Sequence, residues 1–289
     1  MAWFGPAGTP ESFSAMGFKH TDQMPQYLQS MGLTAFEYQC GRGVRVRQDA
    51  AENLGRLARE KNIRLTLHAP YYISLSSLEE EKRLNSIQYI LQSAQACRWM
   101  GGNRIVVHSG SCAKMTREEA VSLAKETLKK AQQALDDAGL SEIHICPETM
   151  GKINQLGSLE EVLELCTVDD RFLPCIDFGH LNARTLGGLM TKEAVTQVFD
   201  EIENRLGIDR LRRIHSHFSK IQYTSGGEKC HLTFADTQYG PDFEPVAELT
   251  VKKGCHPVFI CESAGTQAED ACTMRDLFLA AGGELSKLS

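Results

Sequence analysis

Acidic and histidine side chains stand at the ends of the apolar, strand-length stretches of this sequence. Six of the eight expected strands carry such a residue at or near their end. The sequence has 9 histidines and 37 acidic residues among 289, so chance would place about one or two of them at eight such ends. The six residues are His68, His108, Glu148, Asp177, His215 and Glu262.

The stretch RFLPCIDFGHLNA, residues 171–183, raises the clearest question. An apolar run with Phe172, Leu173 and Ile176 ends in Asp177, and His180 follows three residues later. A carboxylate at the tip of a buried strand costs several kcal/mol of desolvation unless a partner compensates it. We therefore expect Asp177 to face a metal ion and His180 to face the same cavity.

The chemistry of the whole set points to metal binding. Any one of these residues, taken alone, is better explained as a hydrogen-bonded histidine or an ion-paired carboxylate. Three histidines and three carboxylates at one edge, however, are difficult to pair without a cation. Mixed imidazole and carboxylate ligands suit zinc or manganese better than magnesium or calcium. With His180 the set is too large for one tetrahedral site, so it predicts two or more metals that share bridging carboxylates.

The elements that would position these residues alternate between strand and helix. One helix is expected from Arg117, because Thr116 and Glu119 form a capping-box pattern and Gly139 follows the helical pattern. Strict alternation favours right-handed βαβ units and a parallel sheet, and eight strands in this length favour a closed (β/α)8 TIM barrel over an open sheet. The expected strands are 2–5, 35–39, 63–68, 104–108, 143–148, 172–177, 211–217 and 257–262, and the expected helices are 49–61, 84–100, 117–138, 159–166, 192–206, 245–253 and 270–281.

The composition is that of a soluble globular protein, and no linker or internal repeat divides the chain. The sequence is 42% hydrophobic and 24% charged, and its apolar runs are too short to cross a membrane. The first residues lack the features of a signal peptide, and the ten cysteines form no C-x-x-C pair, so we expect free thiols and a cytoplasmic location. We expect one domain, residues 1–282, with a loose tail at 283–289. The net charge of −6 argues against nucleic-acid binding through overall charge, but it leaves room for a local basic patch.

With these residues in view, the sequence resembles the endonuclease IV family of apurinic/apyrimidinic endonucleases, within the xylose isomerase-like barrels. The markers run from about Thr34 to Glu262 and keep their order and spacing. They are LHAPYYISLSS (67–77), VVHSGS (106–111), PETMG with QLGS (147–158), CIDFGHLNA (175–183), IHSHFSK (214–220), His231 and CES (261–263).

The resemblance implies a zinc cluster that cleaves a DNA phosphodiester on the 5′ side of an abasic site. By position, His68 and His108 hold one metal and Glu148 bridges to a second. Asp177, His215 and Glu262 complete the second site, and His180 and His231 belong to a third. Glu148 and Glu262 are the expected catalytic residues. The resemblance then implies two zinc ions as the cofactor and leaves the presence of a third undecided. Manganese is an alternative metal.

The sequence departs from the family pattern at three places. The family's Glu-Asn-Thr is here Glu148-Thr149-Met150, which keeps the carboxylate but changes its neighbour. The family's Asp-x-His is here Lys229-Cys230-His231, so the third site lacks its carboxylate unless Glu228 replaces it or Lys229 itself occupies part of the site. The family's His-Leu-Asn-Asp is here read as 215–218, which leaves His217 as either an extra ligand or a hydrogen-bonded wall residue.

The resemblance also implies a DNA partner, double-stranded and carrying an abasic site, bound by a monomer. Tyr71, Tyr72 and Arg42 lie in loops expected at the active-site edge and could contact DNA. Two alternatives remain open at this point. One is a metal-dependent sugar isomerase or epimerase on the same barrel, and the other is a diverged barrel that binds metal without turnover.

Overall fold

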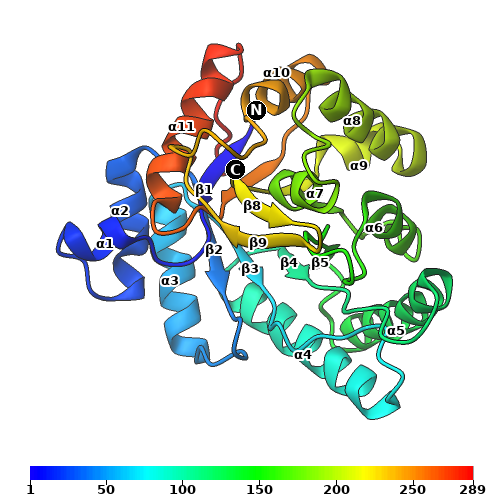
Figure 1. Cartoon of the computed structure of the whole chain (residues 1–289). Coiled ribbons are helices and arrows are strands. Elements are labelled where there is room, and N and C mark those ends of the chain that lie inside the picture. The colour runs from blue at the N-terminus through cyan, green and yellow to red at the C-terminus, as the bar shows by residue number, and fades with distance from the viewer. Residues whose placement is uncertain (289) are drawn as a thin grey trace.

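Eight parallel strands form a barrel in the computed structural model, which describes residues 1–288 (Figure 1). The view in Figure 1 runs roughly along the barrel, with the strands at the centre and the helices around them. The predicted (β/α)8 barrel is therefore confirmed. The strands are β1 (Trp3–Pro6), β2 (Ala35–Gln39), β3 (Arg64–His68), β4 (Arg104–Val107), β5 (His144–Pro147), β6 (Cys175–Asp177), β7 (His215–Phe218) and β10 (Val258–Cys261).

The barrel closes at two seams. Hydrogen bonds give the orders β2-β3-β4-β5 and β1-β10-β7-β6, and parallel bridges Ala7–Glu37 and Glu148–Cys175 join the two halves. Gly5 makes the first seam possible, because a Cβ at this position would lie 1.7 Å from the carbonyl oxygen of Ala35. All eight strands consequently direct their carboxyl ends to the same mouth.

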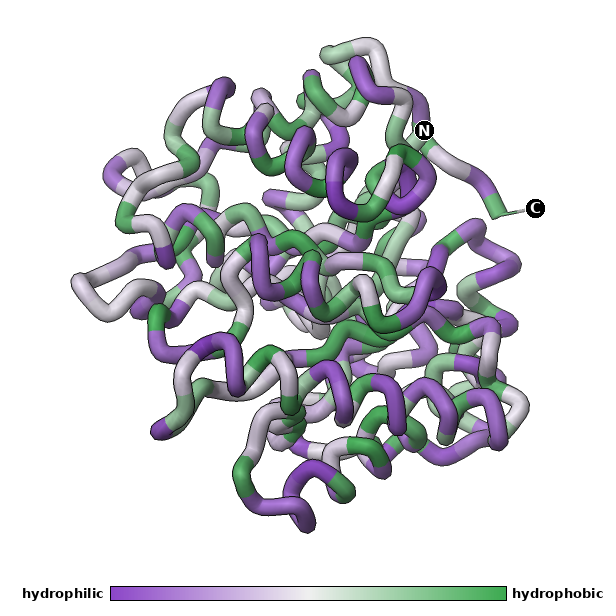
Figure 2. Tube along the Cα trace, turned by 90° about the vertical axis from the view of Figure 1, so that its right-hand side faces the viewer, coloured by the Kyte–Doolittle hydropathy of each residue, from purple (hydrophilic) through white to green (hydrophobic). Residues whose placement is uncertain are grey.

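The helices pack an apolar face against the outside of the barrel. In α3 (Gln48–Glu60) the buried residues Ala51, Leu54, Gly55 and Ala58 recur at helical spacing. Figure 2 shows the resulting alternation of apolar and polar segments along the helical tube. The expected capping box of Thr116 and Glu119 is present at the start of α5. The remaining long helices are α4 (Glu80–Trp99), α5 (Arg117–Asp137), α6 (Leu159–Cys166), α8 (Lys192–Leu206), α10 (Glu244–Lys252) and α11 (Gln267–Ala280), and α3 spans Gln48–Glu60.

Side chains fill the barrel in layers. Small apolar clusters occupy part of its interior, one around Trp3, Val258 and Ile260 and another around Val106 and Cys146. Buried charged residues occur at both ends of the barrel, since Arg104 begins β4 and Asp177 ends β6. All ten cysteines are free, as expected from their spacing.

Two strand predictions were too long at their amino ends. The strand expected from Phe172 begins at Cys175, after Pro174, which has no N–H for the ladder. The strand expected from Leu211 begins at His215, because Leu211 belongs to the short helix α9 (Ile208–Arg212), where it is buried.

Several elements were not predicted. An antiparallel hairpin follows β7 and consists of β8 (Ile221–Thr224) and β9 (Gly227–His231). Figure 1 shows this hairpin in front of the barrel strands, toward the viewer. The other unpredicted elements are α1 (Glu11–Ala15), a 3-10 turn (Thr21–Gln23), α2 (Met24–Met31) and α7 (Phe178–Arg184).

The segment after Gly282 makes backbone contacts along its described part. Ala2 N–H donates to the carbonyl oxygen of Glu284, and Ser286 N–H donates to that of Ala2. Leu288 N–H donates to the Asn62 side chain. Ser289 lies outside the described residues, and the division into a domain of residues 1–282 and a loose tail of 283–289 stays a prediction.

Candidate metal centre

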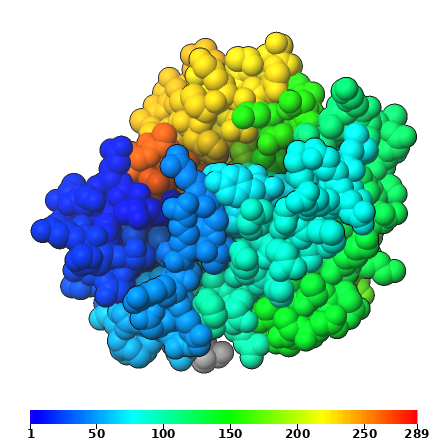
Figure 3. All heavy atoms as spheres, turned by 90° about the horizontal axis from the view of Figure 1, so that it is seen from below, coloured from blue at the N-terminus to red at the C-terminus, as the bar shows by residue number. Residues whose placement is uncertain are grey.

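A cavity of about 380 Å³ opens at the carboxyl ends of the barrel strands. Loops that follow different strands surround it, and the hairpin forms one wall. In Figure 3 the yellow segment that contains the hairpin lies at the upper edge of the molecule, beside the cyan segment after β3. The cavity is lined by His68, Tyr71, His108, Glu148, Met150, Lys152, Gln155, His180, Glu228, His231 and Glu262.

A first group of candidate ligands joins His68, His108 and Glu148. The Nε2 atoms of His68 and His108 lie 3.3 and 3.0 Å from the same oxygen, Oε2 of Glu148. Burial by itself raises the pKa of Glu148, but the surrounding imidazoles of His217 and His108 hold it well below its usual value. Burial lowers the pKa of His108. The group therefore offers an ionised carboxylate beside a neutral imidazole, which is a metal-binding combination.

A second group joins Glu148, Asp177, His217 and Glu262. His217 Nδ1 lies 3.0 Å from Glu148 Oε1 and 3.5 Å from Glu262 Oε1. Asp177 caps α7, since its Oδ1 accepts the His180 N–H at 2.7 Å. Its other oxygen, Oδ2, is buried and accepts no hydrogen bond, although it lies 3.3 Å from Nδ1 of His180. A buried carboxylate oxygen without a partner is costly, and a metal ion would compensate that cost.

The geometry does not place His215 in this group. His215 begins β7, deeper in the barrel, where its Nε2 donates to Glu37 Oε2 at 2.9 Å. His217, two residues later, occupies the position beside Asp177 and Glu262 that was expected for His215. The placement of His215 beside Asp177 and Glu262 was therefore wrong. The cause is the period of two along a strand, which gives both histidines the same inward direction but different depths.

This correction moves the family pattern along the chain. With His217 as its first residue, the family's His-Leu-Asn-Asp falls on His217-Phe218-Ser219-Lys220. Two of the four positions then carry similar residue types, His217 and Phe218. Lys220 stands where the pattern has an aspartate.

A third group joins His180, Glu228 and His231. Glu228 Oε2 lies 3.5 Å from His180 Nε2, and its Oε1 lies 3.9 Å from His231 Nε2. Lys229, which replaces the family aspartate, is exposed. The hairpin register shifts here, because Gln222 pairs with Cys230 and Tyr223 pairs with Glu228. Lys229 is the extra residue of a β-bulge, and the bulge turns Glu228 to the same side as His231.

Gly151 permits this approach of the hairpin to the loop after β5. A Cβ at Gly151 would lie 2.6 Å from the Cβ of Glu228 and 2.9 Å from Cδ2 of His180. Glu228 N–H donates to the carbonyl oxygen of Gly151, which fastens the hairpin to the loop. A larger residue at position 151 would push Glu228 away from His180.

In three of the candidate histidine ligands, His68, His180 and His231, the Nδ1 atom contacts a backbone carbonyl or a hydroxyl, and the Nε2 atom faces the site. Nδ1 of His68 donates to the carbonyl oxygen of Ala69, and Nδ1 of His180 donates to that of Thr149. The hydroxyl of Ser219 lies 2.8 Å from Nδ1 of His231. Such contacts fix ring orientation and tautomer in metal sites. Together with the unpartnered Asp177 oxygen, they fit a site that binds divalent metals.

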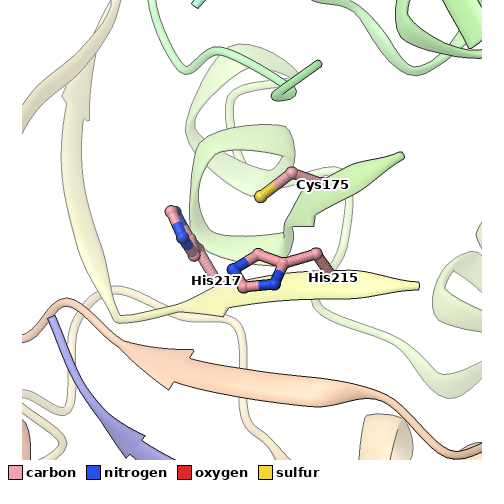
Figure 4. A group of neighbouring side chains, drawn as sticks. All are labelled: Cys175, His215 and His217. Carbon is pink, nitrogen blue, oxygen red and sulfur yellow. The ribbon is translucent and has the colours of Figure 1, made fainter. Parts of the chain in front are cut away.

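A buried polar group beneath the mouth was missed by the sequence analysis. Glu37 on β2 is fully buried and contacts both His215 and His217. Burial opposes its ionisation, yet the two imidazoles hold its pKa well below the usual value. Figure 4 shows that His215 and His217 project from β7 to one side, toward Cys175 of β6. The signal available in the sequence was an acidic residue in the middle of the expected strand 35–39.

The predicted DNA-contact residues lie in different surroundings. Tyr71 lines the cavity, and its ring stacks on His108 at 5.3 Å between centroids. Tyr72 is exposed and packs near Tyr89. Arg42 lies in a neighbouring hollow that Tyr71 also lines. The structure thus brings Tyr71 to the candidate ligands but not Tyr72 or Arg42, and their binding to DNA stays a prediction.

Comparisons with known proteins agree with this architecture. A family model described as xylose isomerase-like TIM barrel matches residues 25–277. The uncharacterized protein MJ0133 of Methanocaldococcus jannaschii is 32% identical over 91% of this chain and 92% of its own length. A probable endonuclease 4 of Acholeplasma laidlawii is 31% identical, over 57% of this chain and 56% of that protein.

Solved structures with low sequence identity share the fold. A D-tagatose 3-epimerase-like protein superposes with a TM-score of 0.69 and 18% identity, covering 96% of this chain and 97% of the other. Endonuclease IV from Thermus thermophilus superposes with a TM-score of 0.65 and 20% identity over the same shares. Epimerases and nucleases are thus equally similar in fold, and only the site can separate them.

Proposed function

Because this chain belongs to the xylose isomerase-like TIM barrel family, we propose that it is a metal-dependent phosphodiesterase that cleaves DNA on the 5′ side of abasic sites in base excision repair. The observation that carries the proposal is the convergence of three ligand groups on one cavity, with Glu148 common to two of them. The resemblance to probable endonuclease 4 proteins supports the same chemistry.

The proposed ligands divide among three sites. His68 and His108 hold the first metal and share Glu148 with the second, which Asp177, His217 and Glu262 complete. His180, Glu228 and His231 hold the third. Zinc suits this mixture of imidazole and carboxylate, and manganese is the alternative. Bound divalent metals supply Lewis acidity for the phosphate and lower the pKa of water from 15.7 to about 7.

The chain's own residues supply orientation and proton transfer. Glu148 keeps its charge among the histidines and so holds the first two groups together. Glu262 lies at the cavity wall with its side chain 17% exposed, so it can reach solvent and accept a proton from the attacking water. Lys152, exposed in the loop after β5, lines the same cavity and can contact a phosphate. We assign catalysis to Glu148 and Glu262.

The cavity beside Tyr71 could receive an extruded abasic nucleotide. Such a nucleotide has no base to unstack, so its extrusion from a duplex costs less than that of an intact one. Tyr71 beside the cavity can pack against the exposed sugar, while Tyr72 and Arg42 would contact the flanking duplex. The proposed partner is therefore double-stranded DNA, with the enzyme acting as a monomer in the cytoplasm. No helix among residues 1–288 combines the length and apolar character that a membrane span requires.

A sugar epimerase or isomerase is the second candidate, and the cavity favours it. At about 380 Å³, with the hairpin as one wall, the cavity falls within the usual range for small-molecule sites. Glu148 and Glu262 would then exchange protons with a sugar carbon. The histidine-rich ligand set weighs toward the phosphodiesterase.

Strand cleavage of a duplex with one tetrahydrofuran abasic analogue tests the proposal. The analogue cannot undergo β-elimination, so each cut is hydrolytic. We expect one incision on its 5′ side, lost after chelation and restored by zinc or manganese. An undamaged duplex and the folded Glu148→Gln variant serve as controls, and both should stay inactive. No incision by the fully metallated enzyme would refute the proposal, and epimerisation of a ketose would establish the second candidate instead.

A further inference from the structure

The carboxylate of Glu37 is isolated from solvent and surrounded by hydrogen-bond donors. Thr66 Oγ1 donates to its Oε2 at 3.0 Å, and His215 Nε2 donates to the same oxygen at 2.9 Å. On the other side, Gln39 Nε2 donates to Oε1 at 3.3 Å, and His217 Nε2 lies 2.9 Å from that oxygen without the alignment of a hydrogen bond. A buried carboxylate is costly even when it is paired, so an apolar residue would serve the barrel interior better. The cost points to a role beyond packing.

The position of His217 between two sets of carboxylates suggests that role. Its Nδ1 faces Glu148 and Glu262 in the cavity, and its Nε2 faces Glu37 beneath the cavity. A neutral imidazole carries a proton on only one nitrogen, and the other nitrogen is free to bind a metal. A carboxylate that attracts the proton to Nε2 leaves the Nδ1 lone pair directed toward Glu148 and Glu262.

We propose that Glu37 is a positioning residue for the metal centre: its carboxylate, 2.9 Å from Nε2 of His217, attracts the ring proton to that nitrogen and thereby presents Nδ1 as the ligand. The inference rests on the proposed metal sites and assigns a residue that the family motifs do not contain. His215 and Thr66 act as supports, because their bonds to Oε2 hold the carboxylate still while Oε1 faces His217. His215 is consequently a support of the carboxylate rather than a metal ligand.

Cys175 offers a competing account of the same histidines. Its thiol is grouped with His215 and His217 as a potential ligand set, and Figure 4 shows it on the side to which both rings project. If a metal bound there, His217 would use its deeper nitrogen, and Glu37 would be a neighbour of that metal. Both accounts involve the same ring, but they predict different effects for replacement of the thiol.

The experiment compares zinc binding by the wild type, Glu37→Gln, Glu37→Asp and Cys175→Ser. Zinc stoichiometry and affinity are measured by competition with a chromophoric chelator, on protein whose fold is verified by circular dichroism. Glu37→Gln keeps the size of the side chain but can place an amide donor against Nε2, which favours the wrong tautomer. We expect zinc to bind about 10–100-fold more weakly at one site in this variant. Glu37→Asp keeps an acceptor and should lose less, and Cys175→Ser should bind like the wild type.

The outcomes separate the inference from the proposed function. If the wild type binds no zinc, the metal centre itself is refuted. If the wild type binds zinc and folded Glu37→Gln binds it equally well, Glu37 has no positioning role. Equal losses in Glu37→Asp and Glu37→Gln, in proportion to lost thermal stability, would indicate a structural role only and overturn the inference. Loss of one zinc in Cys175→Ser would also overturn it, because the thiol would then be the ligand.

Discussion

At the scale of single residues, depth along a strand decides which histidine reaches the carboxylates of Glu148 and Glu262. His215 and His217 have the same parity on β7, and the sequence correctly predicted that both point inward. Only the register with β6 separates them, because Asp177 pairs with His217 and Cys175 pairs with His215. Register depends on the barrel as a whole and leaves no mark in a local pattern. Glu37 was missed for a related reason, since its partner His215 lies 178 residues away in the sequence, on another strand.

Replacement of these two histidines should therefore have different effects. In His217→Asn we expect the loss of one bound zinc and of most activity on the abasic duplex, because Nδ1 is removed from the second group. His215→Asn, the matched control, should keep the wild-type number of zinc ions, with affinity changed only indirectly through Glu37. Elemental analysis of the dialysed proteins provides the measurement. A zinc deficit in His215→Asn with none in His217→Asn would contradict the assignment.

At the scale of elements, the hairpin of β8 and β9 determines the third group. Its Lys229 occupies the bulge, and its Glu228 replaces the carboxylate that the family pattern places one residue later. The bulge could not be predicted, because the hairpin itself gave no alternating apolar pattern. In contrast, β3, β5 and α5 have clear periodicity and caps, and the structure places them within one or two residues of the predicted bounds.

Adjacent substitutions in the hairpin test this arrangement. Glu228→Gln should bind one metal fewer than the wild type. The neutral amide is a poor metal ligand, and His180 and His231 alone would hold the third metal weakly. Lys229→Ser, next to it, should keep all the metals because its side chain faces solvent. Metal content after exhaustive dialysis is the readout. A deficit in Lys229→Ser but not in Glu228→Gln would mean that the lysine side of the hairpin faces the site.

A second prediction at this scale concerns the end of α5. Arg171, in the connection before β6, lies 2.6 and 3.0 Å from the two oxygens of Asp136 on α5. Its guanidinium lowers the pKa of Asp136 from 3.8 to about 2. Because the pKa is depressed in the folded state, the stabilisation is fully present above pH 3.8 and is lost as the pH falls toward 2.

Urea unfolding of the metal-free wild type and Asp136→Asn between about pH 2 and pH 6 measures this effect. The free energy of unfolding should differ between the two proteins at the upper end of this range, and the difference should disappear at the lower end. Asp137→Asn serves as the control, since its carboxylate accepts a hydrogen bond from Gln133 and not from an arginine. A difference for Asp136→Asn that stays constant over the whole range would rule out the charge as its cause.

At the scale of the whole molecule, the order of elements was sufficient to predict the barrel. The eight strands and seven long helices follow from apolar periodicity, glycines and caps, and a closed barrel is the arrangement that accommodates them. The convergence of His68, His108, Glu148, Asp177 and Glu262 follows from that topology, since every barrel strand ends at the mouth. The loop helices, the hairpin and the interior contacts of Glu37 depend on long-range packing and could not be predicted locally.

Metal binding should stabilise the folded molecule as a whole. The candidate ligands lie on or directly after β3, β4, β5, β6, β7 and β10, on α7 and on the hairpin, so their geometry exists only in the folded chain. Zinc at about 100 times its Kd adds about 2.7 kcal/mol per site and should raise Tm by about 5 °C or more. Differential scanning calorimetry with and without a chelator measures the shift. Glu148→Gln should show a smaller rise, and an unchanged Tm in the zinc-loaded wild type would contradict the metal centre.

The bulge at Lys229 has a consequence for comparing this protein with its relatives. Column-by-column alignment sets Lys229 against the family aspartate and scores the third site as lost. In three dimensions the carboxylate of Glu228 lies between His180 and His231, because one inserted residue changed the spacing without changing the face. A metal ligand in this fold is therefore identified by its place at the barrel mouth and not by its column in a sequence alignment. Homologues that lack the aspartate should be searched one residue upstream before they are classed as inactive.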